Sequence, residues 1–175
     1  MGTLIVSTVQ TQNIKADANT TAMTINAAGS VLKPELPFWR LRGPTNAETG
    51  STAALGTILF TAHTSGDSTG GGVTHASGVV TVPTTGLYQI NVHINARSEN
   101  ASYTHTGIAV QVNGADIDVR NYAEADVYTR WRDVSFSSIV PLNANDTIKV
   151  INNYTTHSIN IDGNSWTGFT GYLIG

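Results

Sequence analysis

The sequence predicts an all-β fold built as an antiparallel two-sheet sandwich, and three observations lead to this prediction. Short runs of β-branched and aromatic residues recur along most of the chain. Glycine, asparagine, aspartate and proline separate these runs at turn-sized intervals. Little of the chain shows the 3.6-residue apolar period of an amphipathic helix. About ten short strands joined by tight turns favour two packed sheets.

Two parts of the chain differ in composition. Residues 1–37 form a predicted N-terminal anchoring arm and linker, and residues 38–175 form a predicted head domain, because apolar residues become frequent only from Phe38. The arm opens on MGTLIVSTVQTQNI, which reads as a lone strand over residues 1–15. The small, polar linker contains one short predicted strand at residues 22–25.

The head contains alternating patterns that are typical of strands with one buried face. In GLYQINVHINAR the apolar residues from Tyr88 to Ala96 share one face, and Gln89 to Asn95 share a face that is wet or lies at a polar interface. The predicted strands are FWRLR (38–42), GTILFTA (56–62), GVVTVP (78–83), GLYQINVHINAR (86–97), GIAVQVNG (107–114), ADIDVRNY (115–122), RWRDVSFSSIVPL (130–142), DTIKVINN (146–153) and WTGFTGYLI (166–174).

Turn signals separate these strands. Asn113-Gly114 is a strong hairpin signal between two of them. Residues 143–146 form another tight connection, and the glycine-rich stretch SGDSTGGG at 65–72 is expected to be a flexible loop.

Composition excludes several classes of function. Only 12% of the 175 residues are charged, the net charge is −3, and no basic stripe is present, so we expect no nucleic-acid partner. The absence of cysteine excludes disulfides and thiol chemistry. No apolar run approaches the ~20 residues that span a bilayer, so we expect no membrane partner. The N-terminus does not read as a secretory signal.

The order of features from residue 78 onward is shared with a known family. A strand ending in proline precedes a Gly-x-Tyr that opens a long strand, a leucine and an aspartate follow late in the domain, and the chain closes on two aromatics around glycine. These positions are Pro83, Gly86, Tyr88, Leu142, Asp146, Phe169, Gly171, Tyr172 and Leu173. The set resembles the globular-head domain of complement component one, subcomponent q, whose jelly roll is shared with tumour necrosis factor (TNF).

The resemblance covers about residues 38–174 and implies a TNF-like jelly roll. It also implies a homotrimer around a three-fold axis, and binding rather than catalysis. NAND at 143–146 departs from the family, which usually has glycine before this aspartate. Separately, the start GTLIVSTVQTQNIKADANTTAMTI resembles the openings of bacteriophage tail and structural proteins. Together the two resemblances imply a small trimeric phage virion protein.

Histidines and aromatics give few signs of a chemical site. The five histidines show no metal-ligand spacing, so we expect no metal and no cofactor. His93 lies on the polar face of its strand, which suits a solvated face or a trimer interface. Trp131, between Arg130 and Arg132, is interpreted as a core residue, a trimer contact or a sugar-stacking platform.

Acidic residues cluster at 115–126. Asp116 and Asp118 fall on one strand face, which permits a Ca²⁺ ion, but Arg120 continues that face and makes a row of ion pairs the simpler interpretation. No base or pocket accompanies the carboxylates, and no Gly-x-Ser-x-Gly elbow is present, so we expect that the protein is not an enzyme.

The favoured hypothesis is a capsid decoration or cement protein on the outer surface of the virion. Its partner would be the major capsid protein or another virion scaffold protein. The arm would pair with the sheet edge of that partner, or alternatively fold back on its own trimer. The anchoring contacts would come from Leu4, Ile5, Val6, Val9 and Ile14.

Two other hypotheses stay open at this point. One is a short tail fibre or receptor-binding tip, in which the loops at 63–76, 98–106 and 153–165 recognise a host surface glycan. The other is an enzyme that degrades surface polysaccharide, which would need paired carboxylates in a groove.

Overall fold

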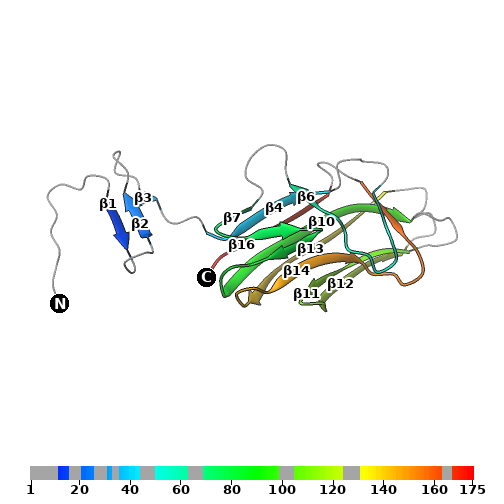
Figure 1. The fold of residues 1–175 in the computed structure, drawn as a ribbon. Coiled ribbons are helices and arrows are strands. Elements are labelled where there is room, and N and C mark those ends of the chain that lie inside the picture. Colours follow the sequence, from blue (N-terminus) through cyan, green and yellow to red (C-terminus); the bar gives the residue numbers. More distant parts are fainter. Residues whose placement is uncertain are drawn as a thin grey trace. The chain divides into compact units, whose positions relative to one another are not determined.

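The chain folds as two units of unequal size. The computed structural model describes residues 12–15, 21–25, 31–32, 36–43, 50–62, 69–98, 105–123, 131–162 and 167–175. The compact units are Met1–Leu36 and Pro37–Gly175 (Figure 1). All the regular secondary structure in the described residues is β-strand, which confirms the all-β prediction.

The N-terminal unit contains a small antiparallel sheet with the strand order β1-β2-β3. Gln12 pairs with Ile25 and Ile14 pairs with Met23, while Ile25 also pairs with Val31. Its strands are β1 (Gln12–Lys15), β2 (Thr21–Ile25) and β3 (Val31–Leu32).

This sheet corrects the expectation of a lone strand over residues 1–15. β1 pairs with the next strand of its own chain, because a strand left alone exposes unpaired backbone groups that a neighbour close in sequence satisfies. The short strand expected at residues 22–25 is confirmed as β2. Residues 1–11 lie outside the described residues.

The larger sheet of the head is centred on β10 (Figure 1). Its strands pair antiparallel in the order β5-β15-β10-β16-β4-β6, with β13 also on β10 and β7 also on β4. They are β4 (Phe38–Arg42), β5 (Gly50–Thr52), β6 (Thr61–Ala62), β7 (Thr69–Gly70), β10 (Gly86–Ser98), β13 (Arg132–Leu142), β15 (Ile159–Ile161) and β16 (Gly168–Leu173).

The smaller sheet of the head has the order β12-β11-β14-β9-β8. Its strands are β8 (Thr74–Ala76), β9 (Val79–Thr81), β11 (His105–Val112), β12 (Ala115–Ala123) and β14 (Thr147–Asn152). The chain passes from β10 in the larger sheet to β11 and β12 in the smaller one, returns to β13, and crosses again to β14. This repeated exchange between two antiparallel sheets is the connectivity of a jelly roll.

The core lies between the two sheets and follows the alternation along each strand. In β10 the even-numbered residues from Tyr88 to Ala96 are at most 2% exposed, as the sequence pattern predicts. The largest fully buried side chains are Trp39, Tyr88, Phe169, Leu41, Ile58, Ile90, Ile94, Ile108, Leu142, Ile148, Ile159 and Ile161.

An aromatic cluster fills one part of this core. The ring centroid of Trp39 lies 5.5 Å from that of Phe169 and 6.1 Å from that of Tyr88. Gly171 is directly opposite Trp39 in the β16–β4 pairing. A Cβ atom on Gly171 would overlap the Cζ2, Cη2 and Cε2 atoms of the Trp39 indole, the last at 2.7 Å. The indole therefore occupies the space that any larger residue at position 171 would need.

Two turns at one end of the head are tied together by side chains. Asn113 and Gly114 have φ angles of 52° and 85°, which confirms the predicted hairpin between β11 and β12. Asn113 Nδ2 donates to Asp146 Oδ1 at 2.7 Å, and Asp146 Oδ2 accepts the Asn143 amide at 2.7 Å. These bonds hold the pKa of Asp146 below its usual range. Asn145, with φ of 73°, adopts the left-handed conformation that glycine takes most easily.

Several strand predictions for the head were incomplete. The sequence patterns did not reveal β5, β7, β8 and β15, which have two or three residues each. Residues 69 and 70, expected in a loop, pair with β4. Of the expected strand GTILFTA, only Thr61–Ala62 is regular strand, while Thr57 forms a single bridge to Ile151. Such short pairings depend on tertiary neighbours more than on local propensity.

Candidate binding surface on the larger sheet

The candidate site is the face of the larger sheet that is turned away from the core, called the outer face below. The even positions of β10 are buried, so its odd positions lie on the outer face. Residues of β4, β13 and β16 also alternate between the core and the outer face, with the odd positions of β13 and the even positions of β4 and β16 outward. Its members are Phe38, Arg40, Arg42, Leu87, Gln89, Asn91, His93, Asn95, Arg97, Asp133, Ser135, Ser137, Ile139, Pro141, Gly168, Thr170 and Tyr172.

One end of the outer face is apolar. Leu87, Ile139 and Tyr172 are 45%, 54% and 49% exposed, and Phe38 and Pro141 lie beside them. The strand pairing makes them neighbours, since Tyr172 is opposite Phe38 and Leu87 is opposite Pro141. We call these five residues the apolar band. Exposed apolar patches of this kind mark interaction sites more often than isolated surface hydrophobics do.

A shallow hollow adjoins the apolar band. It has a volume of about 370 Å³ and mostly apolar walls. Two of its lining residues are joined by a backbone hydrogen bond, since the Leu87 amide donates to the Gly175 carbonyl at 2.5 Å; the Ile174 amide donates to the Leu87 carbonyl at 2.8 Å. The hollow is lined by Thr85, Gly86, Leu87, Pro141, Leu142, Asn143 and Gly175.

The middle of the outer face is polar but uncharged. Gln89 Nε2 donates to Asn91 Oδ1 at 3.2 Å and to Ser137 Oγ at 3.1 Å, and Ser137 Oγ donates to Asn91 Oδ1 at 2.8 Å. This network fixes the three side chains in one arrangement. A surface of ordered amides and hydroxyls without charge is inexpensive to remove from water when a partner covers it.

Beyond this network the outer face carries a weak ion pair. His93 Nε2 lies 3.5 Å from Asp133 Oδ1, which also accepts a hydrogen bond from Asn95 Nδ2 at 2.7 Å. Both members of the pair are half exposed or more. Exposed pairs of this kind contribute about 0–1 kcal/mol.

Arg97 and Trp131 form a stacked pair next to this point. Arg97 Cζ lies 4.8 Å from the centroid of the Trp131 ring, and both side chains are half-buried. A guanidinium over an indole at this distance is a cation–π contact. Trp131 is half-buried and is not among the core residues, so the core interpretation of this side chain is wrong.

The predicted trimer or ligand residues are distributed between two faces. His93 lies on the outer face, and Trp131 stacks on Arg97, which the alternation of β10 places on the same face. Arg132 pairs with Ala96 on the alternate face and donates from Nη1 to the Trp131 carbonyl at 3.2 Å. Arg130 lies outside the described residues.

The predicted anchoring residues lie in the N-terminal unit. Ile14 is in β1, opposite Met23 of β2. Leu4, Ile5, Val6 and Val9 lie outside the described residues, so their anchoring role stays a prediction.

The acidic residues of β12 pair within their own strand pair. Asp118 Oδ2 accepts from Arg120 Nη2 at 2.7 Å, and Asp116 Oδ1 accepts from Gln111 Nε2 at 2.8 Å. The ion pair is the one that the alternation predicted. Among the residues that the structure describes, no three His, Asp or Glu side chains are grouped as metal ligands would be.

A search of the described segments for membrane spans finds no helix with the length and hydropathy needed to cross a bilayer.

The sequence analysis missed the apolar band. One signal was available in VSFSSIVPL, where Ile139 stands in the same alternation as Ser135 and Ser137 and is therefore an apolar residue on a polar face. Phe38, Leu87 and Tyr172 come from β4, β10 and β16, and only the strand order brings them beside Ile139 and Pro141 of β13.

Comparisons with known proteins support the fold. No protein-family model matches the chain, and no curated protein sequence matches it. Among solved structures, murine APRIL at pH 5.0 has a TM-score of 0.60 at 14% identity, over 79% of this chain and 99% of that one. Eiger TNF from S. frugiperda has a TM-score of 0.62 at 13% identity, over 82% and 94%. The larger unit is therefore a TNF-like jelly roll, as the resemblance implied.

Proposed function

We propose that the chain is a non-enzymatic structural protein whose heads associate as a homotrimer through the outer face of the larger sheet. We further propose that it serves on the outer surface of a phage virion as a capsid decoration or cement protein. The trimer follows from the complement-head resemblance, and the virion role follows from the resemblance of the N-terminal stretch to phage structural proteins.

The apolar band is the observation that carries the proposal of self-association. Leu87, Ile139 and Tyr172 lie on one patch, and each of these large residues is about half exposed. Complete burial of such a side chain stabilises by about 1.5–3 kcal/mol, so covering the exposed half contributes about 1 kcal/mol for each residue and each copy. A contact repeated around a ring multiplies this gain.

The remainder of the outer face is compatible with a subunit contact. Its centre is the neutral network in which Gln89, Asn91 and Ser137 hydrogen-bond to one another. The cores of protein interfaces are depleted of charge in the same way. Catalysis gains no support from the acidic residues of the smaller sheet, because Asp118 is paired with Arg120 and Asp116 with Gln111.

The anchoring role is assigned to the first residues of the chain. Because β1 pairs with β2, the proposed anchoring segment is limited to residues 1–11. Its apolar residues include Leu4, Ile5, Val6 and Val9. The partner would be the major capsid protein or another scaffold protein. Changing Ile5 and Val9 to aspartate should release the trimer from particles without dissociating it, as measured by co-sedimentation. Full loading of this variant would refute the anchor.

Native mass spectrometry of the full chain at micromolar concentration tests the trimer. The expected mass is three times the 18.5 kDa of one chain. Ile139→Asp should reduce it to that of one chain, because a carboxylate would be buried in the contact. Ile117→Asp is the matched control, since Ile117 is an isoleucine that is 40% exposed on β12, in the smaller sheet. A monomeric wild type, or a trimeric Ile139→Asp variant, would overturn the proposal.

A receptor-binding tip is the second candidate, and the Arg97–Trp131 pair favours it. A half-buried indole beside a guanidinium is suited to stacking on a sugar ring and bonding its hydroxyls. Glycan-array binding that Trp131→Ala abolishes would support this function. Copy number separates the two candidates, because hundreds of copies per particle indicate a capsid position and about a dozen indicate a tail.

A further inference from the structure

We propose that the small N-terminal sheets of neighbouring copies pack against one another through one apolar face, so that the N-terminal unit is a second site of association between copies. This inference rests on the proposed trimer, and it concerns a surface that the heads do not supply. The surface is one face of the sheet β1-β2-β3, and its occupant is the same face of the other copies.

The strand register divides the small sheet into two unlike faces. Residues directly opposite each other in paired strands share a face, and so do alternate residues along one strand. Ile14 is opposite Met23, which stands two residues before Ile25 in the same strand. Ile25 is in turn opposite Gln12 on one side and Val31 on the other. These five residues therefore share one face.

The two faces differ in composition. Across the regular part of the pairing, neither face carries a charged residue. The second face places Thr24 opposite Asn13 and Leu32, so it is mostly polar. A contrast of this kind is typical of a sheet with one buried side. The first face is called the small apolar face below, and it is defined as Ile14, Met23, Ile25 and Val31.

The small apolar face needs a second layer to cover it. A sheet buries its apolar side against another element, and a layer of a few short strands depends on such packing. The described part of the unit Met1–Leu36 contains only the single layer β1-β2-β3 (Figure 1). Small units are usually stabilised by disulfides, metal ions or association. Residues 1–36 have neither cysteine nor histidine, so association is the simplest of these means.

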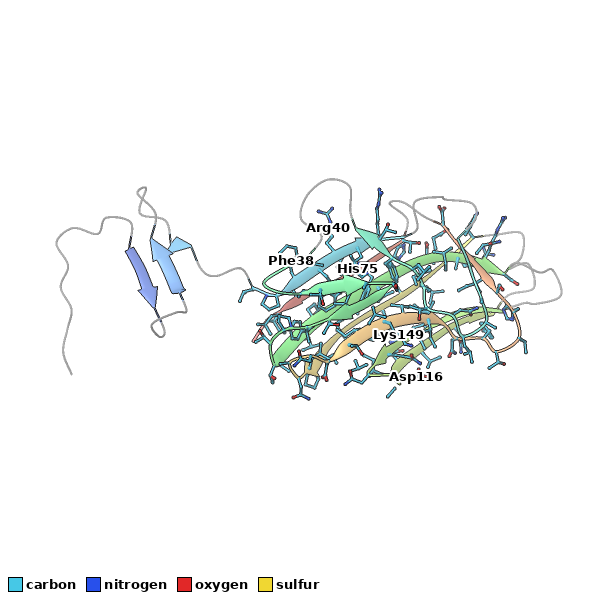
Figure 2. All side chains as sticks on the ribbon, viewed as in Figure 1. Phe38, Arg40, His75, Asp116 and Lys149 are labelled. Carbon is cyan, nitrogen blue, oxygen red and sulfur yellow. The ribbon has the colours of Figure 1, made fainter. Side chains whose placement is uncertain are left out.

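A second copy is the occupant that the tether favours. Leu32 and Phe38 are six positions apart, and Phe38 is the first residue of β4 and a member of the apolar band (Figure 2). An extended chain spans at most about 3.6 Å per residue, so this connection is no longer than about 22 Å. In the proposed trimer the three small sheets are therefore tethered to one particle at a millimolar effective concentration. At that concentration a weak apolar contact forms readily.

Three copies also favour one arrangement of the sheets. Three faces turned toward one axis form a triangular prism, in which each small apolar face contacts the two others. A face-to-face pair would cover only two of the three. Because β1 begins at Gln12, this assembly gathers the three proposed anchoring segments at residues 1–11. Three gathered segments bind a scaffold more tightly than one segment does.

Cross-linking of single cysteines tests which face is covered. The chain has no native cysteine, so Met23→Cys and Thr24→Cys each carry one thiol, on opposite faces of β2. Each full-length variant is first shown to be trimeric by native mass spectrometry and is then treated with a short bis-maleimide at micromolar concentration. Met23→Cys should give covalent pairs that contain about two-thirds of the chains, because a two-ended linker joins only two of three thiols. Thr24→Cys is the matched control and should remain mostly single chains.

Charge substitution measures how much the small sheets contribute to the trimer. Met23→Asp should raise the concentration of half-dissociation about ten-fold or more, because it brings carboxylates of several copies into an apolar contact. Thr24→Asp puts the same charge on the other face and should stay within about two-fold of wild type. Sedimentation velocity across a dilution series measures both values, and circular dichroism checks that the heads remain folded.

The outcomes separate this inference from the proposed function. A trimeric wild type whose two cysteine variants cross-link equally would overturn the packing of the small sheets and leave the trimer of heads intact. A thiol at position 23 that neither cross-links nor reacts with a one-ended maleimide would show that something other than a second copy covers the face, which also overturns the inference. A monomeric wild type would refute the proposed function itself.

Discussion

Replacing Gly171 with alanine should destabilise the head by about 2 kcal/mol, within the range of 1–3 kcal/mol for overpacked cores. The new methyl group would overlap the six-membered ring of Trp39. That ring cannot move aside freely, because Trp39 is 1% exposed and its centroid lies 5.5 Å from that of Phe169. The gain from restricting the unfolded chain, about 0.4–1 kcal/mol, opposes only part of the loss.

Urea denaturation followed by far-ultraviolet circular dichroism, at one fixed protein concentration, measures this loss. Gly168→Ala is the matched control in the same strand, because a Cβ atom there meets only the Leu41 carbonyl oxygen at 3.6 Å, an ordinary contact. Its free energy of unfolding should stay within about 0.5 kcal/mol of wild type.

A double-mutant cycle separates the overlap from other effects. Trp39→Phe removes the indole atoms that the methyl group meets, together with a buried Nε1 that has no hydrogen-bond partner. In that background Gly171→Ala should be neutral or stabilising, which gives a coupling energy of about 2 kcal/mol. Equal losses in both backgrounds would refute the assignment of the destabilisation to Trp39.

Other predictions concern the turns and a half-buried histidine. Asn113→Ala removes the bonds to Asp146 and to Thr147 and should lower the free energy of unfolding by about 1–2 kcal/mol, as measured by urea denaturation; an unchanged midpoint would contradict the tie between the turns. Asn145→Gly should be neutral or stabilising and Asn145→Ala should cost about 1 kcal/mol, because φ is positive there; thermal melts would show equal midpoints if the backbone were relaxed. Burial lowers the pKa of His75 below 6.5, so the unfolded chain binds its proton at higher pH than the folded one, and stability should fall as pH drops below 6.5. His75→Gln should flatten this fall between pH 7.5 and 5, and an identical slope would exclude His75 as its source.

Local patterns predicted the parts of the fold that depend on few neighbours. The alternation of β10 placed Tyr88 and Ile90 in the core, because a long strand with one buried face has a clear period of two. The Asn113-Gly114 hairpin could be predicted because its turn needs two positive φ angles, and asparagine and glycine are the residues that adopt them most easily.

Features that depend on distant pairing could not be read from the sequence. β5 and β15 pair with each other across more than a hundred residues of chain, and neither has a strong local pattern. The apolar band likewise combines residues of four strands, so single strands show only fragments of it. The pairing of β1 with β2 of the same chain was missed, because residues 12–15 belong to a longer run of strand-forming residues that reads as one strand.

An electron-density or cryo-EM map of the assembled protein tests the central claim most directly, because it shows which surface the copies bury. The predicted result is three heads around an axis, with Leu87, Ile139 and Tyr172 covered by the adjacent copies. Heads that associate through the smaller sheet, or that leave the outer face of the larger sheet open to solvent, would contradict it.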